Sequence, residues 1–196
     1  MDDLRHLLRS SPGSPLPVDW LPALPGGLPG ALGLTMLPGR RGRGAAGRVW
    51  ERELALDLRQ LRDDHRADRL VSLVEDHELD AYGVPGLVEA AAAAGLTHTR
   101  FPIPDGTVPR EGPPALQPLV VELVGALRAG ERVVVHCVAG LGRTGTVSGC
   151  VLVALGMEPP EALALLAEIR GPHCPETGAQ RWFVGAYLDE VGLIQG

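Results

Sequence analysis

The sequence contains no lysine, because all 18 basic residues among its 196 positions are arginine. A chain without lysine has no P-loop lysine to bind nucleotide phosphates and no amine to form a Schiff base. The composition therefore argues against protein kinases, Walker-type ATPases and pyridoxal-phosphate enzymes. The accompanying bias toward arginine and alanine is typical of a GC-rich, bacterial genome.

Other features are scarce as well. Three cysteines at irregular spacing argue against a disulfide framework and favour a reducing, cytoplasmic location. No apolar run approaches the length of a membrane span, and the N-terminus lacks the apolar core of a signal peptide. The net charge of −6 argues against nucleic-acid binding, which requires a basic surface. We therefore expect neither a membrane nor a nucleic acid as partner.

Patterns of apolar residues predict an α/β fold. Short apolar runs predict strands at residues 32–37, 69–74, 96–101 and 132–136. Helical spacing of apolar residues predicts helices at residues 49–66, 85–94, 115–129, 143–156, 160–170 and 178–191. This alternation favours one domain with a mostly parallel sheet. Residues 1–17 are expected to form a flexible Pro/Gly-rich lead-in to a domain that spans residues 18–196.

The segment of residues 133–145 (VVVHCVAGLGRTG) carries the clearest chemical signal. An apolar strand leads into a glycine-rich turn and then into a helix, and the free N–H groups of such a turn form a concave anion site. Cys137 ends the strand, where the positive end of the helix favours a thiolate. The Arg143 guanidinium is suited to hold two oxygens of a tetrahedral oxyanion. The Thr144 hydroxyl is placed to donate to the sulfur.

This segment also has two competing interpretations. A cysteine after an apolar strand is often an inert core residue, but that does not explain the polar residues that open the helix. The spacing Gly140-x-Gly142-x-x-Gly145 also matches the dinucleotide-binding fingerprint. That fingerprint requires a second strand ending in an acidic residue about 20 positions later, whereas residues 147–157 continue as a helix.

The pattern HCxxGxGRTG, formed by residues 136–145, resembles the phosphate loop of the cysteine-dependent protein phosphatases. Over about residues 18–191 the chain resembles the kinase-associated branch of the dual-specificity phosphatases. The segments that carry this resemblance are LPGR at 37–40, Asp57-Leu58, LVEDHEL at 73–79 and PIPDGTVP at 102–109.

The resemblance implies a fold and a chemistry. The implied fold is a central, parallel-rich sheet of four or five strands with helices on both faces. The implied chemistry uses no metal and no cofactor, and it proceeds through a cysteinyl-phosphate intermediate. The implied substrate is a phosphorylated protein or peptide, although the bacterial composition argues against a cyclin-dependent kinase as partner.

Expulsion of an alkoxide or phenoxide from a phosphate ester requires a proton donor. Asp105 is the predicted acid, because it lies in a proline-stiffened loop after a predicted strand, at the carboxyl edge of the sheet where ligands bind. It precedes Cys137 by 32 residues, and the acid of the resembling phosphatases lies at a similar separation. The alternative is that Pro-Asp-Gly is only a turn. Glu111 is the second candidate for the acid.

Further site residues follow from their positions in the motif. His136 is expected to orient the loop by hydrogen bonding rather than to act as a base. Gln180 matches the glutamine that helps place the hydrolytic water in the resembling family; the alternative is an exposed position in the first turn of the last helix. The loop residues expected to bind the substrate phosphate are Val138, Ala139, Gly140, Leu141 and Gly142.

Other residues have more than one interpretation. Glu78 is either a buried acceptor that supports the loop or a surface residue at a helix start. Cys150 is expected in the core, and Cys174 is a minor candidate for a redox role. The cluster of arginines either rims the site and attracts phosphorylated substrate or lies in a solvated loop, the interpretation we favour; its members are Arg40, Arg41 and Arg43.

Three classes of function compete. The favoured class is a phosphomonoesterase, a tyrosine or dual-specificity protein phosphatase that acts through Cys137, Arg143 and Asp105. The second class is a module that binds phosphate esters without turnover, which requires neither a nucleophile nor an acid. The third class is another cysteine-dependent oxyanion enzyme, such as an arsenate reductase, for which Cys150 and Cys174 are not obvious resolving cysteines.

Overall fold

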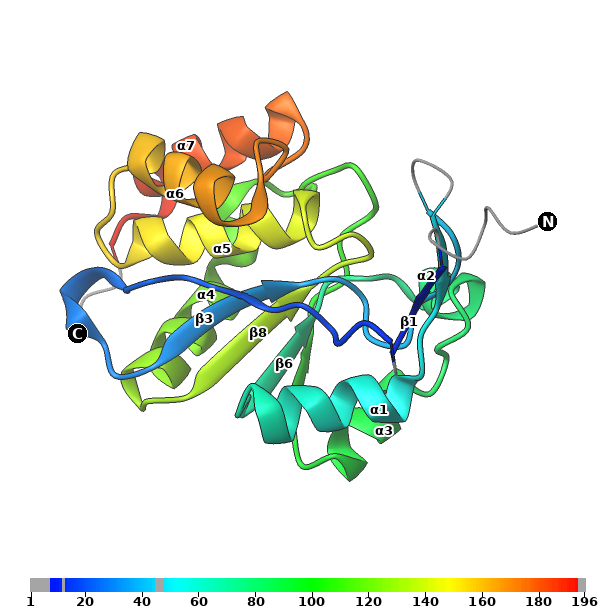
Figure 1. Ribbon diagram of the computed structural model, residues 1–196. Helices are drawn as coiled ribbons and strands as arrows, with labels where there is room; N and C mark the ends of the chain where they lie inside the picture. The colour runs from blue at the N-terminus through cyan, green and yellow to red at the C-terminus, as the bar shows by residue number, and fades with distance from the viewer. Residues whose placement is uncertain (1–7, 12, 45–47, 194–196) are drawn as a thin grey trace.

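The computed structural model describes residues 8–11, 13–44 and 48–193 (Figure 1). Within these residues, the main sheet has five strands in the order β2-β3-β8-β6-β7. Neighbouring strands are parallel except β2 and β3, which are antiparallel. The strands are β2 (Asp19–Trp20), β3 (Ala31–Thr35), β6 (Arg69–Ser72), β7 (Thr97–Arg100) and β8 (Arg132–His136). The predicted α/β domain with four or five mostly parallel strands is confirmed.

Helices cover both faces of this sheet. Figure 1 shows α5, α6 and α7 on one face and α1 with α3 on the other, and α4 packs against β8, α5 and α7. The helices are α1 (Leu54–Arg59), α2 (Asp76–Ala81), α3 (Leu87–Ala93), α4 (Pro113–Arg128), α5 (Gly142–Ala154), α6 (Pro159–Arg170) and α7 (Gly178–Val191). Among the described residues, every helix falls short of the length or apolarity that crossing a bilayer requires.

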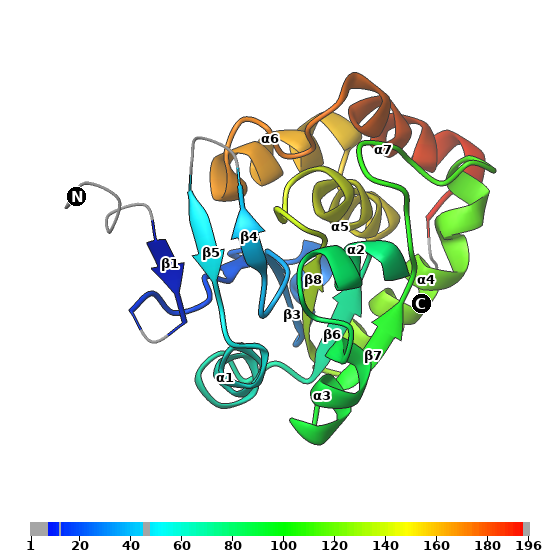
Figure 2. The ribbon, with the colours of Figure 1, turned by 90° about the vertical axis from the view of Figure 1, so that its right-hand side faces the viewer.

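A second, smaller sheet stands beside the main one, in the order β1-β5-β4 (Figure 2). Its strands are β1 (Leu8–Ser10), β4 (Arg41–Arg43) and β5 (Val49–Glu51). The predicted helix over residues 49–66 is therefore wrong in its first part, since α1 begins only at Leu54. The helical spacing comes from leucines at and after that position, whereas Val49 and Trp50 are residue types that favour a strand.

The N-terminal segment packs against the domain where the structure describes it. Leu16 is buried, and the Ser11 hydroxyl donates to Asp57 Oδ1 over 2.6 Å. Arg52 forms a buried ion pair with the same carboxylate, at 2.7 Å, and also donates to the Ser14 carbonyl at 2.9 Å. This part of the predicted flexible lead-in is thus tied down by a charged pair that lies about 40 residues later in the sequence.

The parallel strands bring their carboxyl ends to one edge of the sheet. In the register of β8, His136 is paired with Thr35 of β3 and with Ser72 of β6. The residues that follow these strands therefore lie close together, as expected for a parallel sheet. This edge carries the segment of residues 137–141, which leads into α5.

Candidate active site

Residues 137–141 form a tight turn between β8 and α5. The Gly140 N–H donates to Cys137 Sγ, with a nitrogen–sulfur distance of 3.3 Å, and Cys137 is buried. Gly140 has φ of +72°, and a Cβ there would collide with the carbonyl of Thr35. Only glycine combines a readily adopted positive φ with the absence of a Cβ atom. Glycine at position 140 therefore allows the turn to close over the sulfur.

The carbonyl oxygens of this turn are bound by groups outside it. Arg170 of α6 donates from Nη2 to Ala139 O and from Nε to Gly140 O, each at 2.9 Å, and it is also paired with Asp19. The Val138 carbonyl accepts from the Leu37 N–H at 3.2 Å. These contacts hold negative carbonyl ends away from the sulfur side, which leaves that side suited to an anion.

Arg143 lies in the first turn of α5 and has only 1% of its surface exposed. Its Nη1 and Nη2 donate to the two carboxylate oxygens of Glu78, at 2.6 and 2.8 Å. Burial opposes the charge of Arg143, but the hydrogen bonds and charge of Glu78 raise its pKa above the ordinary value. Burial likewise opposes ionisation of Glu78, yet the hydrogen bonds from Arg143 and from the Glu75 N–H outweigh it and lower the Glu78 pKa.

Glu78 is positioned by α2, a short helix outside the ranges predicted as helices, although a helix start at Glu78 was one of its two interpretations. The Glu75 and Glu78 side chains form a reciprocal capping box at its start. Such a box satisfies N–H groups that otherwise lack partners at a helix end. The structure therefore supports the interpretation of Glu78 as a buried hydrogen-bond acceptor and rules out a surface position.

Asp105 lies in the loop after β7, and 75% of its side chain is exposed. Its Oδ1 is 2.9 Å from Arg143 Nη2, and Arg143 Nη1 donates to the carbonyl of Ile103 in the same loop, also at 2.9 Å. The structure therefore brings the predicted acid and the predicted oxyanion-binding arginine together. Glu111, the second candidate for the acid, is exposed further along this loop.

His136 is fully buried, and its pKa is lowered to about 3, chiefly by burial. Its Nδ1 lies 3.1 Å from the Cys137 carbonyl, which only accepts hydrogen bonds, so Nδ1 carries the proton. The Nε2 atom must then accept from Ser72 Oγ at 2.5 Å, and Ser72 in turn accepts from His98 Nε2 at 2.7 Å. The neutral His136 ring thus links the Cys137 carbonyl to Ser72, and it carries no positive charge near neutral pH.

The structure rejects the predicted contact of Thr144 and the alternative, exposed position of Gln180. The Thr144 hydroxyl is buried and has no hydrogen-bond partner among the described residues, so the predicted bond to the sulfur is not present. Gln180 is buried rather than exposed. Its Nε2 donates to the Thr107 carbonyl at 3.2 Å, which ties α7 to the loop that carries Asp105.

The N–H group of Gly142 already has a partner within the protein. The Gly142 N–H, which was predicted to bind phosphate, instead donates to the carboxylate oxygen Oε2 of Glu176 at 3.1 Å. Sequence analysis missed Glu176, Arg170 and Ser72. The only sequence signal for Glu176 is its place directly before Thr177, the N-cap residue of α7.

The other two cysteines are buried thiols. Burial raises the pKa of Cys150, which lies in the core within α5 as predicted. Cys174 donates to the Leu141 carbonyl at a sulfur–oxygen distance of 3.4 Å, and burial raises its pKa to about 12. Both are protonated near neutral pH and poorly reactive. Across the described part of the chain, no cluster of side chains has the composition of a metal site.

Comparison with known families identifies this arrangement. A family model described as "Polymorphic toxin system, DSP-PTPase phosphatase" matches residues 44–157. The chain belongs to this phosphatase family. The predicted enzyme class, a cysteine-dependent protein phosphatase, is therefore confirmed, and the dinucleotide interpretation is wrong. Its required second strand is absent from residues 142–170, all of them described, because they form α5, a short connection and α6.

The phosphatase has relatives along most of its length. It is 28% identical to rat cyclin-dependent kinase inhibitor 3 and 26% identical to the human protein of that name. Each match covers 180 residues, which are 91% of this chain and 81% of the relative.

Solved structures agree with this assignment. Tk-PTP in its active form has a TM-score of 0.65 and 25% identity, covering 89% of this chain and 97% of that one. A kinase-associated phosphatase with serine in place of its catalytic-site cysteine has a TM-score of 0.79 and 23% identity. That match covers 93% of this chain and 99% of the other and shows the shared fold.

Proposed function

We propose that this phosphatase hydrolyses phosphate esters on protein side chains, with Cys137 as the nucleophile. One observation carries the assignment: the Gly140 N–H donates to the Cys137 sulfur within the turn that opens α5. N–H groups and a helix N-terminus favour a thiolate over a thiol. The thiolate attacks phosphorus, so that a sulfur–phosphorus bond forms while the bond to the leaving oxygen breaks.

Arg143 and the loop N–H groups stabilise the charge of the transferring phosphoryl group. The guanidinium is fixed by Glu78 before any substrate binds. A donor held in place in this way costs no reorganisation at the moment of reaction. The carbonyls of the loop are bound to Arg170 and to the backbone, so they do not compete for this space.

Asp105 donates its proton to the leaving oxygen in the first step. As a carboxylate it then removes a proton from water, whose oxygen attacks phosphorus and breaks the sulfur–phosphorus bond. This second step releases inorganic phosphate and restores the Cys137 thiolate. The contact from Gln180 to the Thr107 carbonyl supports a role for Gln180 in placing that water beside Asp105.

Phosphorylated proteins fit this site better than inositol lipids. Val138, Ala139 and Leu141 make the variable part of the loop apolar, and the chain has no lysine to contact a polyanionic headgroup. We expect phosphotyrosine peptides to be hydrolysed at least as well as phosphoserine or phosphothreonine peptides. Faster release of phosphate from soluble inositol lipids than from phosphopeptides would contradict this substrate class.

The mechanism is tested with p-nitrophenyl phosphate and phosphopeptides, with vanadate as the competing oxyanion. Acid quenching during turnover should trap one phosphate on the peptide that contains Cys137, as identified by mass spectrometry. Phosphopeptide binding without phosphate release would instead support a binding module. Reduction of arsenate without phosphate release would support another oxyanion enzyme.

A further inference from the structure

The hairpin of β4 and β5 has two faces with different chemistry. Arg40, Arg48 and Trp50 line a pocket of about 400 Å³ beside the phosphate loop, where Ala139 and Arg170 complete the wall. Trp50 is paired with Gly42 across the hairpin, and residues that differ by two positions share a face of a strand. Arg40 and Arg48 therefore lie on the face of the hairpin that adjoins the phosphate loop.

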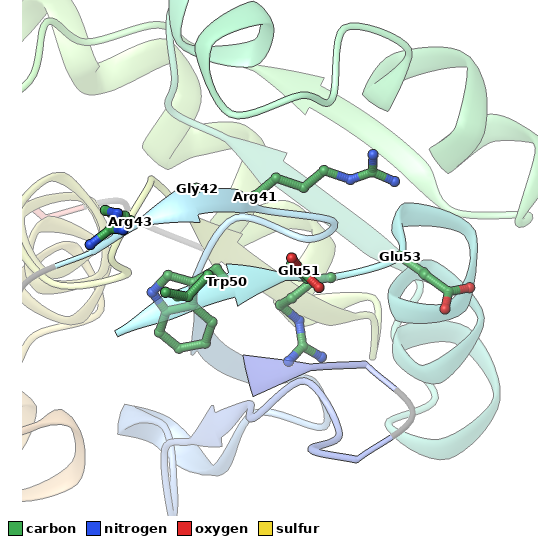
Figure 3. Close-up of a pocket in the computed structure, with 8 residues that line it drawn as sticks. Arg41, Gly42, Arg43, Trp50, Glu51 and Glu53 are labelled. Carbon is green, nitrogen blue, oxygen red and sulfur yellow. The ribbon is translucent and has the colours of Figure 1, made fainter. Parts of the chain in front are cut away.

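The opposite face carries the odd-numbered arginines. Arg41 and Arg43 are exposed and line a second pocket of about 480 Å³, which shares Trp50 with the pocket beside the loop. Figure 3 shows that Glu51 and Glu53 line the same pocket. Two arginines next to two glutamates form a mixed surface, whereas the pocket beside the loop has no carboxylate among its described lining residues. Of the predicted arginine cluster, Arg40 alone rims the site.

Arg40 is a buried cation without a carboxylate partner among the described residues. It is 8% exposed, and its guanidinium lies over the rings of Trp50 and Tyr82, at 5.5 and 5.1 Å from their centroids. Its Nε atom has no hydrogen-bond partner in the described part of the chain, and Nη1 makes one long contact of 3.5 Å to Val138 O. A buried cation is costly unless an anion accompanies it.

The other buried arginines show the contrast. Arg52 is paired with Asp57, and Arg143 with Glu78. Arg170 shares the pocket with Arg40, but its charge is met by Asp19 and its remaining donors by loop carbonyls. Burial lowers the pKa of Arg40, while the charges of Tyr82 and Cys137 act in the opposite direction. An anionic ligand would supply the partner that Arg40 lacks.

We propose that this pocket is a second anion subsite, in which Arg40 and Arg48 bind a second phosphate of a doubly phosphorylated peptide while Cys137 reacts with the first. The inference rests on the proposed function. Trp50, Met36 and Leu141 supply apolar surface in or beside the same pocket, which suits the peptide that links the two phosphates. The subsite thus selects substrates in which phosphorylated residues lie close together in the sequence.

The test compares peptides that carry one phosphotyrosine with peptides that carry a second phosphorylated residue one to four positions away. We expect the best doubly phosphorylated peptide to have a kcat/KM about tenfold higher, the effect of one charge-assisted hydrogen-bond set. The preference should weaken as salt is raised. The ratio of kcat/KM for the doubly phosphorylated peptide to kcat/KM for the singly phosphorylated one should fall toward one in Arg48→Gln and in Arg40→Gln. In the matched control Arg43→Gln this ratio should keep the wild-type value.

Binding separates this inference from the proposed function. Calorimetry with the Cys137→Ser protein should give the same tenfold preference in Kd, and Arg48→Gln in that background should remove it. Hydrolysis of single and double phosphopeptides with equal kcat/KM would overturn the subsite and leave the function intact. A preference that persists in both arginine variants would overturn it too. An arginine-dependent preference seen only with inositol polyphosphates would overturn the assignment to peptides.

Discussion

The carboxylate of Glu78 fixes the guanidinium of Arg143 through two hydrogen bonds, at 2.6 and 2.8 Å, across 65 positions of sequence. Arg143 Nη2 also contacts Asp105 Oδ1 at 2.9 Å. One arginine therefore joins a buried acid that holds it in place and an exposed acid that is proposed to exchange protons. The geometry gives these two carboxylates separate roles, which the following predictions test.

Glu78→Gln should remove the buried ionised partner of Arg143 and leave only its contact with the largely exposed Asp105. The free energy of unfolding should fall by about 3 kcal/mol, measured by urea unfolding. Because Arg143 also loses its fixed orientation, kcat should fall at least about tenfold with little change in KM for p-nitrophenyl phosphate. The matched control is Asp76→Asn on the same helix, whose side chain is 83% exposed. If kcat is unchanged while stability falls, Glu78 is only a structural residue.

Cys137→Ser should abolish turnover while the fold and oxyanion binding persist, because a serine hydroxyl is not ionised at neutral pH and is a much weaker nucleophile. Steady-state release of p-nitrophenol measures the loss, and binding of vanadate shows that the loop is intact. A variant that retains more than a few per cent of the activity would rule out the covalent mechanism. Cys150→Ser is the control, because Cys150 lies in the core within α5.

Asp105→Asn should affect substrates according to how much their leaving groups need a proton. The loss in kcat/KM should be small with p-nitrophenyl phosphate and larger with phenyl phosphate or phosphotyrosine, within the ~10²–10⁴-fold span of general acid catalysis. The measurement is a series of aryl phosphates with rising leaving-group pKa.

The same series decides what Asp105 does. An equal loss for every substrate would mean that Asp105 is only a turn residue and that the acid lies elsewhere. Glu111→Gln, in the same loop region, is the matched control and should leave the dependence on the leaving group unchanged.

The burial of His136 should make the free energy of unfolding depend on pH. The pKa of His136 in the folded protein is about 3, below the ordinary value of ~6.5 for an unfolded chain, so the folded state favours the neutral ring. The associated stability is fully present above about pH 6.5 and is lost as the pH falls toward 3, by up to ~1.4 kcal/mol per unit. Between pH 6.5 and 5 this amounts to about 2 kcal/mol.

Urea unfolding at pH 7 and pH 5 measures this effect. His136→Asn should be less stable than wild type at pH 7, since its contact with Ser72 is lost, but its stability should fall less between the two pH values. Exposed His173→Asn should keep the wild-type slope. An unchanged slope in His136→Asn would show that other groups control the acid sensitivity.

Gln180→Ala should slow breakdown of the phosphocysteine more than its formation, because Gln180 contacts the loop of the proposed base through Thr107. We expect a burst of p-nitrophenol followed by a steady rate about tenfold below wild type. Rapid-quench measurements separate the two phases. Gln117→Ala, an exposed glutamine on α4, should have no burst. Equal slowing of both steps would mean that Gln180 only holds α7 against the loop.

The phosphate loop was predictable because its parts are contiguous. Residues 133–145 contain the strand, the glycine turn and the first helical turn, so local patterning places Cys137 and Arg143 at one anion site. The position of Asp105 at the same site was predictable from its place after a strand, since the carboxyl ends of parallel strands meet at one edge of the sheet. The residues that support these groups were less accessible. Ser72 and Arg170 contact the loop from 64 and about 30 positions away, and neither belongs to a local motif.

Local patterning also misjudged two segments. The helix expected from residue 49 begins later, because Val49–Glu51 joins a sheet whose other strands lie before it in the sequence. The lead-in appeared flexible from its proline and glycine content, yet Ser11 and Leu16 are buried by contacts with residues near position 57. Strand pairing and docking of this kind depend on long-range contacts that composition does not encode.

Local residue order alone decided the fold class and the anion-binding turn at Cys137, since a strand, a glycine turn and a helix N-terminus form an anion site wherever they occur together. Tertiary packing decided which carboxylate holds Arg143, which loop carbonyls are bound, and which arginines of the hairpin face the site. Arg40 and Arg41 are chemically equivalent in the sequence. Only the docking of the hairpin buries Arg40 against Trp50 and Tyr82 and leaves Arg41 exposed, because alternate residues of a strand point to opposite faces.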